Sequence, residues 1–501
     1  MKTPSREIWR KYTEAETFDR IVGFDSVAQM WSVRSKEFAD STAIVDQGES
    51  VSYSALDAEV ARFRSRLGAD MAKGTCVGLL IPNSLAFVRA FLAVVTLGGT
   101  AVILPAHLDE KAVFGCCMKF GIRKLVCVPE TEERTAFAAG RVPGLEVIPA
   151  GDLPDTAAPA AEVGGSDPCV IMFTGGTTGK SKGCLLSNTA VMQGTVNGCY
   201  GYAEVFEQRY LLILPLSHVF GLIRNLLTSL YTGSALFICR NNKDMFRDIA
   251  VFRPTVLVMV PALAEMALSL SKKFGRNMLG EDLKTIICGA APVAPYLVAA
   301  YKEIGIDLFP GYGLTESANL VSGNPESLRL PESVGIMYPD QEYRIEDGEL
   351  WLKGLNMFDG YIGEEEESRT EGWFRTGDLV RVDEEGFLYI TGRIKEIIVL
   401  PSGENVSPAE VEAHFNALDC VQDSQVFEAE NDNGSVILAL EVVPRMTALT
   451  AVPPEEVHSF VRGELEKVNR ALPSFQQVSR IVIRDRDFDR TPSMKIARYK
   501  K

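Results

Sequence analysis

The sequence lacks the marks of several protein classes. Its 501 residues include only four histidines, and its ten cysteines contain no Cys-x-x-Cys pair, so no metal-ligand pattern is present. Most cysteines stand in apolar runs, which is typical of reduced core residues and predicts a cytoplasmic protein. The N-terminal segment is charged and has no apolar core, so it is no signal peptide. The longest apolar run, Phe91 to Pro105, is too short and too rich in Gly to span a bilayer.

The charge balance excludes a further class. The formal net charge is −15, which argues against a non-specific nucleic-acid binder and against a general binder of anionic membranes. Hydrophobic residues make up 46% of the chain and charged residues 23%, as in ordinary soluble globular proteins. A chain of this length has room for roughly two to four domains.

Apolar runs alternate with amphipathic segments over the first 330 residues. The runs at 76–81, 100–104 and 124–128 predict buried strands, and Asn83-Ser84 predicts the start of a helix that ends near Thr96. Such alternation predicts parallel α/β sheets. From Glu342 the pattern changes to short strands and turns, and after about residue 395 it predicts a compact α+β domain.

One Gly- and Thr-rich stretch stands out. The apolar run Cys169 to Phe173 predicts a strand, and a loop with backbone N–H groups, hydroxyls and two Lys follows it. This composition suits a polyphosphate. The P-loop pattern GxxxxGK[ST] fails here because Thr174 stands where Gly is required. A flexible linker and a P-loop NTPase remain open beside a different phosphate loop. The candidate phosphate ligands are Thr174, Gly175, Gly176, Thr177, Thr178, Gly179, Lys180 and Lys182.

Further unusual stretches follow in order along the chain. They are 214–221 (LPLSHVFG), 289–292 (GAAP), 311–317 (GYGLTES), 348–350 (GEL), 360–361 (GY), 372–379 (GWFRTGDL), 392–396 (GRIKE), 403–412 (GENVSPAEVE) and 491–496 (TPSMKI). With the Gly/Thr loop, this ordered set closely resembles the adenylate-forming superfamily of acyl-CoA synthetases, peptide-synthetase adenylation domains and beetle luciferases. The resemblance runs from about residue 25 to the end of the chain.

The resemblance implies an α/β fold in two domains. A large N-terminal domain, residues 1–394, would hold two α/β subdomains and a distorted β-barrel. A small mobile α+β domain, residues 395–501, would close over it. The implied reaction joins a carboxylate to the α-phosphate of ATP with release of pyrophosphate, and a thiol then attacks the acyl-adenylate. ATP, Mg²⁺ and coenzyme A are the expected cofactors.

The resemblance also implies a role for each matching residue. The Gly/Thr loop would wrap the β- and γ-phosphates, Thr315 would bond the α-phosphate, and Glu316 would hold Mg²⁺. Tyr312 would stack on adenine. The backbone around that ring comprises Gly311 and Gly313, with Gly289, Ala290 and Ala291 as the opposite wall. Asp378 would accept the ribose hydroxyls, and Arg393 would reach ribose or phosphate.

Two lysines and one histidine complete the implied machinery. Lys495 would be the adenylation lysine on a mobile loop, although Met494 departs from the Gly usual before it. Lys395 would be the hinge between the two domains. His218 would lie beside the carboxylate and the entry of the thiol.

The substrate acid is predicted to be apolar. The segment 214–221 has no carboxylate, so an amino acid would leave its ammonium unpaired in an apolar pocket. The candidate acyl contacts are Phe220, Met259, Cys288, Gly289 and Gly311. No carrier-protein domain follows Lys501, so we expect free coenzyme A as acceptor. A separate acyl carrier protein is one alternative, and a nucleotide-binding pseudoenzyme disabled by Met494 is another. The motifs do not specify an oligomeric state, and a nucleic-acid partner is not expected.

Overall fold

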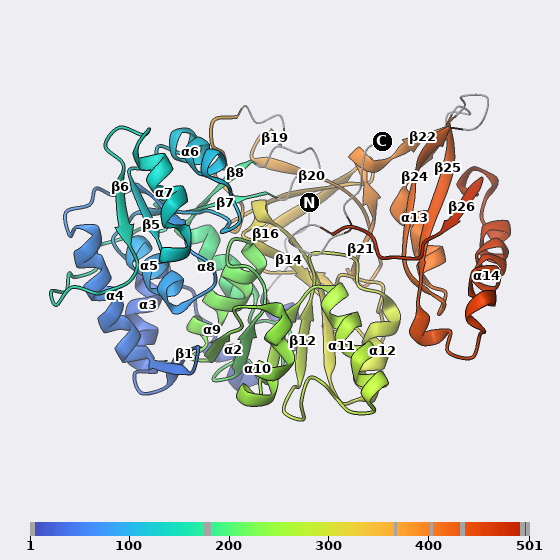
Figure 1. Ribbon diagram of the computed structural model, residues 1–501, viewed down its shortest axis with the longest axis horizontal. Coiled ribbons are helices and arrows are strands. Elements are labelled where there is room, and N and C mark those ends of the chain that lie inside the picture. Colours follow the sequence, from blue (N-terminus) through green and yellow to red (C-terminus); the bar gives the residue numbers. More distant parts are fainter. Residues whose placement is uncertain are drawn as a thin grey trace.

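The computed structural model describes residues 6–174, 182–364, 368–400, 404–430, 436–490 and residue 496. These residues form two large sheets that share one layer of helices, an antiparallel sheet, and a C-terminal domain at one end of the molecule (Figure 1). The predicted α/β fold with a small C-terminal domain is confirmed. Among the described residues, no helix combines the length and the apolar character that crossing a membrane requires.

The first sheet is made mainly by residues 76–187. Its order is β18-β8-β7-β4-β3-β5-β6, with β8 and β18 antiparallel at one edge and the remaining strands parallel. The predicted strands are present with bounds shifted by a residue or two. They are β3 (Cys76–Leu80), β4 (Thr100–Ile103), β5 (Lys124–Cys127), β6 (Glu146–Pro149), β7 (Pro168–Phe173), β8 (Gly183–Ser187) and the distant β18 (Gly360–Tyr361).

The second sheet has the order β15-β14-β13-β12-β11-β9-β10-β1-β2. Its central strands are parallel and nearly all buried, so they consist of continuous apolar residues rather than alternating ones. The strands are β1 (Thr42–Asp46), β2 (Glu49–Ser52), β9 (Arg209–Leu212), β10 (Ala235–Ile238), β11 (Val256–Met259), β12 (Thr285–Cys288), β13 (Asp307–Leu314), β14 (Asn319–Gly323) and β15 (Ile336–Met337).

Helices between the two sheets build one continuous core. Helix α5 (Leu85–Thr96) packs against β3 and β4 on one side and β1 on the other. It begins where predicted, because the hydroxyl of Ser84 accepts from Phe87 N and caps its first turn. The neighbouring helices are α3 (Val27–Glu37), α4 (Tyr53–Leu67), α8 (Asn188–Asn197), the π-helix η2 (Phe220–Leu227) and α9 (Thr228–Tyr231).

The remaining helices of this part of the chain lie around the two sheets. Helices α6 and α7 pack on each other and α7 packs against β5 and β6, while α12 packs on β13. Their bounds, with those of the N-terminal helices, are α1 (Arg6–Trp9), α2 (Ala15–Arg20), α6 (Glu110–Lys119), α7 (Glu132–Ala139), α10 (Met245–Phe252), α11 (Pro261–Phe274) and α12 (Pro295–Glu303).

The β-rich region that was expected as a distorted barrel forms an antiparallel sheet. Its order is β16-β17-β20-β19, with β21 paired to β20, and register shifts interrupt two of its pairings. The strands are β16 (Gln341–Glu346), β17 (Glu349–Gly354), β19 (Arg369–Thr370), β20 (Trp373–Val382) and β21 (Leu388–Arg393). Strand β18 leaves this region to join the first sheet, so it ties the two together.

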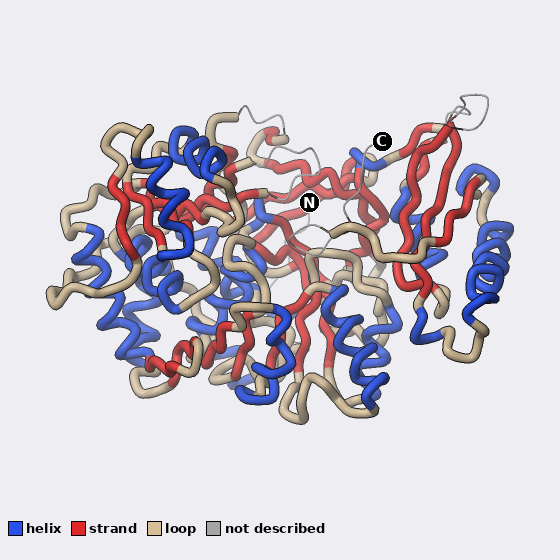
Figure 2. The backbone as a smooth tube through the Cα atoms, in the orientation of Figure 1, coloured by secondary structure: helices blue, strands red, loops and turns tan. Residues whose placement is uncertain are grey.

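The C-terminal region has its own hydrophobic core, drawn from residues between Ile398 and Val478. A three-stranded sheet carries two helices on it (Figure 2). The predicted hairpin is present, and its turn lies outside the described residues. The elements are β22 (Ile398–Val399), β23 (Asn405–Val406), α13 (Pro408–Asn416), β24 (Val421–Glu430), β25 (Val436–Pro444), α14 (Val457–Ala471) and β26 (Arg480–Ile483).

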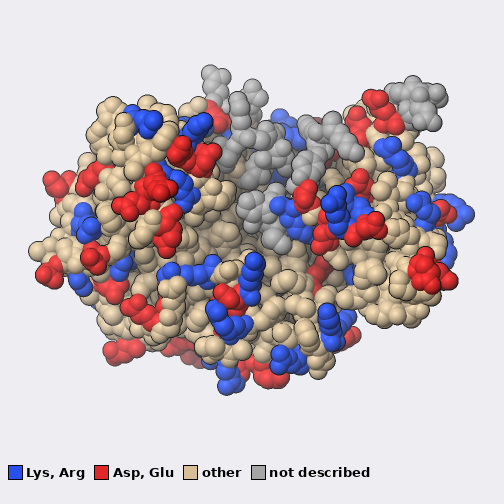
Figure 3. Space-filling view, viewed as in Figure 1, with Lys and Arg blue, Asp and Glu red and all other residues tan. Residues whose placement is uncertain are grey.

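Charged and aromatic side chains join this domain to the rest of the molecule. The guanidinium of Arg445 lies 4.0 Å from the ring centre of Tyr296, whose hydroxyl donates to Glu265 Oε1 at 2.9 Å. Burial and the nearby charge of Asp423 raise the pKa of Glu265. On the face shown in Figure 3, acidic and basic side chains are intermixed over both domains.

Candidate active site

Two Gly-containing segments meet where strand β12 ends beside β13. The two strands pair in register at Cys288 and Pro310, so Gly289–Ala291 follow the end of β12 while Gly311–Gly313 continue along β13 next to them. The approach is close, because a Cβ on Gly289 would lie 2.9 Å from the carbonyl oxygen of Gly311. A Cβ on Gly313 would lie 1.6 Å from Asn319 O. Larger residues therefore cannot replace these glycines without moving the backbone.

Tyr312 and Arg393, which are partly exposed, form one polar cluster around the buried carboxylate of Asp378. The Tyr312 hydroxyl donates to Asp378 Oδ2 at 2.5 Å, and Arg393 Nε donates to Asp378 Oδ1 at 2.5 Å. Asp378 and Arg393 are directly opposed on β20 and β21, whereas Tyr312 comes from the large sheet. Burial and Asp378 raise the pKa of Tyr312 well above its usual value, so the phenol stays protonated and donates.

A second carboxylate fixes the backbone that presents Asp378. Glu349 on β17 is buried and accepts from Arg375 Nε at 3.0 Å and from Gly377 N at 3.0 Å. Thr376 adds a hydroxyl that accepts from Asp378 N and donates to a carbonyl on β17. The turn at Gly377, where φ is +73°, is therefore held on both sides.

The base of the Gly/Thr loop is a closed β-hairpin. Thr174 N donates to Lys182 O at 3.0 Å, and Lys182 N donates to the Thr174 hydroxyl at 3.3 Å. The residue that breaks the P-loop pattern thus closes the loop at its neck. Gly175, Gly176, Thr177, Thr178, Gly179 and Lys180 lie outside the described residues, so their predicted phosphate contacts stay predictions.

Glu316 lies beside this neck. Strand β18 pairs with β8, which starts one residue after Lys182, and the hydroxyl of Tyr361 on β18 donates to Glu316 Oε1 at 2.5 Å. Lys182 Nζ lies 4.6 Å from the centre of the Tyr361 ring. Thr315 directly precedes Glu316 and is partly exposed. The structure therefore brings Thr315, Glu316 and the loop neck into one region.

Glu364 is the counter-ion of the loop lysine. Its carboxylate lies 3.0 Å from Lys182 Nζ and 3.1 Å from Lys119 Nζ. Hydrogen bonds from these two ammonium groups hold the pKa of Glu364 below its usual range. The two ion pairs therefore persist in mildly acidic solution and are lost as the pH falls through that lowered value.

His218 begins the helical segment that continues into η2. Its Nδ1 accepts from Phe220 N at 3.2 Å, which assigns the hydrogen of the neutral ring to Nε2. The preceding backbone is held by Asn83, whose amide nitrogen donates to Leu214 O at 2.8 Å and whose oxygen accepts from Leu216 N at 2.9 Å. His218 is thus placed next to the ends of the central strands.

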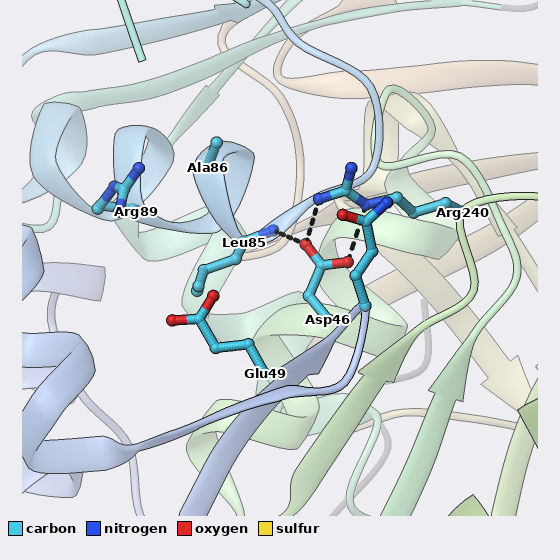
Figure 4. A pocket seen from close by; sticks show the side chains of 7 residues that line it. Asp46, Glu49, Leu85, Ala86, Arg89 and Arg240 are labelled. Carbon is cyan, nitrogen blue, oxygen red and sulfur yellow. Dashed lines mark hydrogen bonds and ion pairs between the residues drawn. The ribbon is translucent and has the colours of Figure 1, made fainter. Parts of the chain in front are cut away.

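Leu85, two residues after Asn83, lines a pocket whose charged side chains hold the start of α5 in place. Asp46 accepts from Leu85 N at 2.8 Å and from Arg240 Nε and Nη2 at 2.8 and 2.7 Å (Figure 4). Arg89, also at this pocket, is turned away and pairs with Glu59 at 3.3 Å. Because these charges already have partners, the pocket anchors the start of α5.

The predicted acyl contacts are gathered in one place. A Cβ on Gly289 would lie 3.5 Å from Phe220 Cζ, so the two residues are neighbours. Met259 and Cys288 are buried and directly opposed at the ends of β11 and β12. Burial raises the pKa of the Cys288 thiol, so it stays protonated and acts as an apolar group. The surroundings of Phe220 are therefore apolar, as expected.

The structure describes only one of the two lysines with a predicted role. Lys395 is exposed in the single turn Ile394–Glu396 that joins β21 to β22. Lys495 and Met494 lie outside the described residues. The roles of all the predicted site residues stay predictions.

Three site residues were missed by the sequence analysis. Tyr361 and Glu349 stand in the stretches GY and GEL, whose order was noted without a role for either side chain. Arg224 stands alone among apolar residues of 219–231, and a single charge in such a run was the available signal. It is fully buried in η2.

The site combines the neck of a Gly/Thr-rich loop, an aromatic–carboxylate cluster and a carboxylate beside the loop. This combination is typical of an enzyme that uses a nucleotide. Comparisons with known proteins narrow this class. A family model described as AMP-binding enzyme matches residues 31–362, and one described as AMP-binding enzyme C-terminal domain matches residues 395–500. The chain therefore belongs to the AMP-binding enzyme family.

Curated relatives and solved structures agree with this assignment. The chain is 30% identical to a feruloyl-CoA synthase from Amycolatopsis sp. over 405 residues, which cover 76% of this chain and 81% of that protein. It is 27% identical to a long-chain-fatty-acid–CoA ligase from Yersinia pestis, with 88% and 89% covered. The o-succinylbenzoate CoA synthetase from Bacillus subtilis, in complex with its acyl-adenylate, is 26% identical, with a TM-score of 0.77 and 94% and 96% covered.

Proposed function

We propose that this chain is an ATP-dependent acid–CoA ligase that forms AMP. A carboxylate oxygen of the acid attacks the α-phosphorus of ATP, and the bond to pyrophosphate breaks. The sulfur of coenzyme A then attacks the carbonyl carbon of the acyl-adenylate, and AMP leaves. The observation that carries the proposal is that Glu316 lies beside the loop neck, four residues after Tyr312 of the Tyr312–Asp378–Arg393 cluster, in a chain whose relatives are CoA ligases.

The Tyr312–Asp378–Arg393 cluster suits a nucleoside. A carboxylate offers about four acceptor positions, and Asp378 uses three of them for Tyr312 and Arg393. The contact of Arg393 Nη2 with Oδ2 is the longest, at 3.4 Å. Ribose hydroxyls would take the remaining position and replace this contact. Adenine would stack on Tyr312 against Gly289–Ala291.

Glu316 suits Mg²⁺ held jointly with phosphate. Among the described residues, no group of three or more His, Cys, Asp or Glu side chains could hold a metal alone. Mg²⁺ commonly binds one or two carboxylates together with substrate phosphates, and Glu316 beside the loop neck supplies such a carboxylate. The ion would neutralise phosphate charge. Tyr361 would orient the Glu316 carboxylate, and Thr315 would donate to the α-phosphate.

The remaining residues would act at the acid and the thiol. His218, with its hydrogen on Nε2, would lie beside the reacting carboxylate, and Phe220, Met259, Cys288 and Gly311 would contact the acyl group. Lys495 would bridge the carboxylate and the α-phosphate. The division at 394/395, with Lys395 as the hinge, is part of the proposal. Ten cysteines, eight of them buried, support a reducing, cytoplasmic location.

Carboxylate-dependent ATP–pyrophosphate exchange tests the proposal. The panel covers short to long fatty acids, benzoates, phenylacetates, cinnamates and amino acids, each with and without coenzyme A. Exchange with one class of acid, together with acyl-CoA formation, is the expected result. Exchange without a thioester would make an acyl carrier protein the acceptor.

The lysine loop needs a separate control. Lys495→Ala should abolish exchange while ATP binding, followed by calorimetry, stays within a few-fold. ATP binding without exchange for any acid would contradict the ligase and indicate a nucleotide-binding pseudoenzyme.

A further inference from the structure

Arg224 is a cation inside the N-terminal domain without a counter-ion. It lies in the π-helix η2, and its exposed fraction is 0%. In the part of the chain that the structure describes, its three guanidinium nitrogens make no hydrogen bond of good geometry, their nearest polar partners are the hydroxyls of Tyr202 and Tyr210, and no acidic side chain forms an ion pair with them. Arginine cannot lose its proton in proteins, so the charge stays. A buried, unpaired charge is costly.

The groups nearest to Arg224 are phenols. Its guanidinium carbon lies 5.4 Å from the ring centre of Tyr202, and Tyr210 and Tyr338 also lie close enough to feel its charge. Burial raises the pKa of Tyr210 and of Tyr338, so both are neutral at pH 7. These phenols line the cation with polarisable rings, yet they supply no negative charge.

Arg224 lies farther along the same helical segment as the proposed acyl contacts. His218 begins this segment, Phe220 is one turn before Arg224, and the Phe220 ring faces Gly289. Six residues of an α-helix span about 9 Å along the axis, and the wider π-helix η2 rises less per residue, so the span is roughly the length of a benzoate ring. Tyr202, which Arg224 overlies, also packs edge-on against Phe309, two residues before Gly311.

We propose that Arg224 is the counter-ion of a second carboxylate, at the end of the acid that does not react. The proposal rests on the proposed ligase function and narrows its substrate to dicarboxylic acids. The middle of the molecule would pass between the apolar contacts Phe220, Met259 and Cys288. The second carboxylate would accept two parallel hydrogen bonds from the guanidinium.

Such a site discriminates strongly against monocarboxylic acids. The guanidinium is already out of water in the free protein, so a dicarboxylic acid gains the pairing without desolvating Arg224 again. A monocarboxylic acid of the same length would leave the cation unpaired. Sites built to bond a polar group reject the analogue that lacks it by factors far larger than a missing methylene causes.

Matched pairs of acids test the proposal. Terephthalate is compared with 4-methylbenzoate, 4-carboxycinnamate with 4-methylcinnamate, and adipate with hexanoate, by kcat/KM for pyrophosphate exchange. Wild type should prefer the dicarboxylic member of at least one pair by about 100-fold. Arg224→Met should reverse that preference, and Arg224→Lys should keep it with about tenfold lower kcat/KM.

A second buried arginine provides the control. Arg64 is 6% exposed, and its Nε donates to Ala158 O at 2.8 Å. Arg64→Met should lower stability without changing the ratio of kcat/KM values. A reversed ratio therefore cannot come from general loosening of the fold.

The outcomes separate the two proposals. No exchange with any acid would overturn the ligase function. Exchange in which wild type prefers the monocarboxylic member of every pair, or in which Arg224→Met keeps the wild-type ratio, would overturn the role of Arg224 alone. If Arg224→Met does not fold, the role of Arg224 is tested instead by the Tm of the wild type in the presence of AMP and each acid of a pair. A dicarboxylic acid should then raise Tm more than its partner, and equal shifts in every pair would overturn the role.

Discussion

Asp378 and Arg224 are both charged side chains buried in the N-terminal domain, and their surroundings differ completely. The Asp378 side chain is 3% exposed and accepts from Tyr312 and Arg393, and its own backbone is held through Thr376. Arg224 is equally inaccessible, and among the described residues its nearest polar partners are neutral phenols and none is a carboxylate. The protein supplies an ionised partner for the charge of Asp378. It supplies none for the charge of Arg224.

This difference separates two ways of preparing a binding site. Around Asp378 the protein has already ordered every group, so a nucleoside would meet a fixed acceptor. At Arg224 the protein carries the cost of desolvation before any ligand arrives, so a matching anion would recover it. Each of the following predictions tests one side of this comparison.

Replacing Asp378 should have the largest effect. Asp378→Asn keeps the shape but removes the negative charge that Tyr312 and Arg393 share. We expect kcat/KM for ATP to fall by about 100-fold, and the free energy of unfolding to fall by about 1–3 kcal/mol because buried donors lose a charged acceptor. Steady-state kinetics and urea unfolding measure the two quantities.

Asp383 is the control for this change. It lies at the β20–β21 turn and accepts from Phe387 N and the Tyr389 hydroxyl, away from Tyr312. Asp383→Asn should leave kcat/KM for ATP within threefold of wild type. Equal losses in both variants would mean that Asp378 acts only through the fold of its hairpin.

Replacing Arg224 should change stability in the opposite direction. Arg224→Met removes an unpaired buried charge and fills the space with an apolar chain, so we expect the free energy of unfolding to rise by about 1–3 kcal/mol. Thermal and urea unfolding of the ligand-free protein measure it. A loss of stability instead would show that the tyrosines around Arg224 already compensate its charge.

Glu265 is intermediate between Asp378 and Arg224 in how far the protein compensates its charge. Its hydrogen-bond partner is the neutral phenol of Tyr296, and burial together with Asp423 raises its pKa. The folded state therefore binds the proton more tightly than the unfolded state, so stability falls as the pH rises from the ordinary value through the raised one. Glu265→Gln should remove this slope and stabilise the protein at pH 7 by less than about 1 kcal/mol.

Unfolding curves measured from about pH 4 to pH 8 cover this slope. Glu281→Gln, an exposed change in the same domain, should keep the wild-type slope. A Glu265→Gln variant with the full wild-type slope would assign the dependence to another group.

Glu364 should give the smallest effect because its charge is partly in water. Glu364→Gln frees Lys182 from its ion pair, so phosphate would no longer compete with a carboxylate. Pairs of this kind are worth about 0.2–1 kcal/mol, so KM for ATP should fall about two- to fivefold. Glu385→Gln, which breaks an exposed pair with Arg329, should leave KM unchanged. A rise in KM for Glu364→Gln would mean that Glu364 positions Lys182.

The strands and the caps of helices were predictable because they depend on local patterns. Ser84 was predicted to start α5 and does so, and the apolar run before Thr174 is strand β7. The motif order also identified the family. What the sequence could not give was contact between distant segments, such as Tyr361 with Glu316 or Tyr312 with Asp378.

The residues predicted to contact the acyl group give a clearer example of contacts that local sequence cannot predict. Local composition around Phe220 and Met259 predicted an apolar, uncharged acid, and their surroundings are apolar. Arg224 was passed over because its run contains otherwise apolar or small polar residues. Only the absence of a counter-ion among the described residues, which depends on side chains from three other segments, distinguishes it.

The pairing of β18 with β8 also means that one strand is synthesised long before its partner. The ribosome makes roughly 170 residues after Ser187 before Gly360 appears, which takes about ten to thirty seconds at ordinary rates of synthesis. During that interval the edge of β8, next to the loop neck, has no strand beside it. Unpaired edges are templates for association with other chains. The edge of β8 is therefore open to association with other chains until β18 emerges.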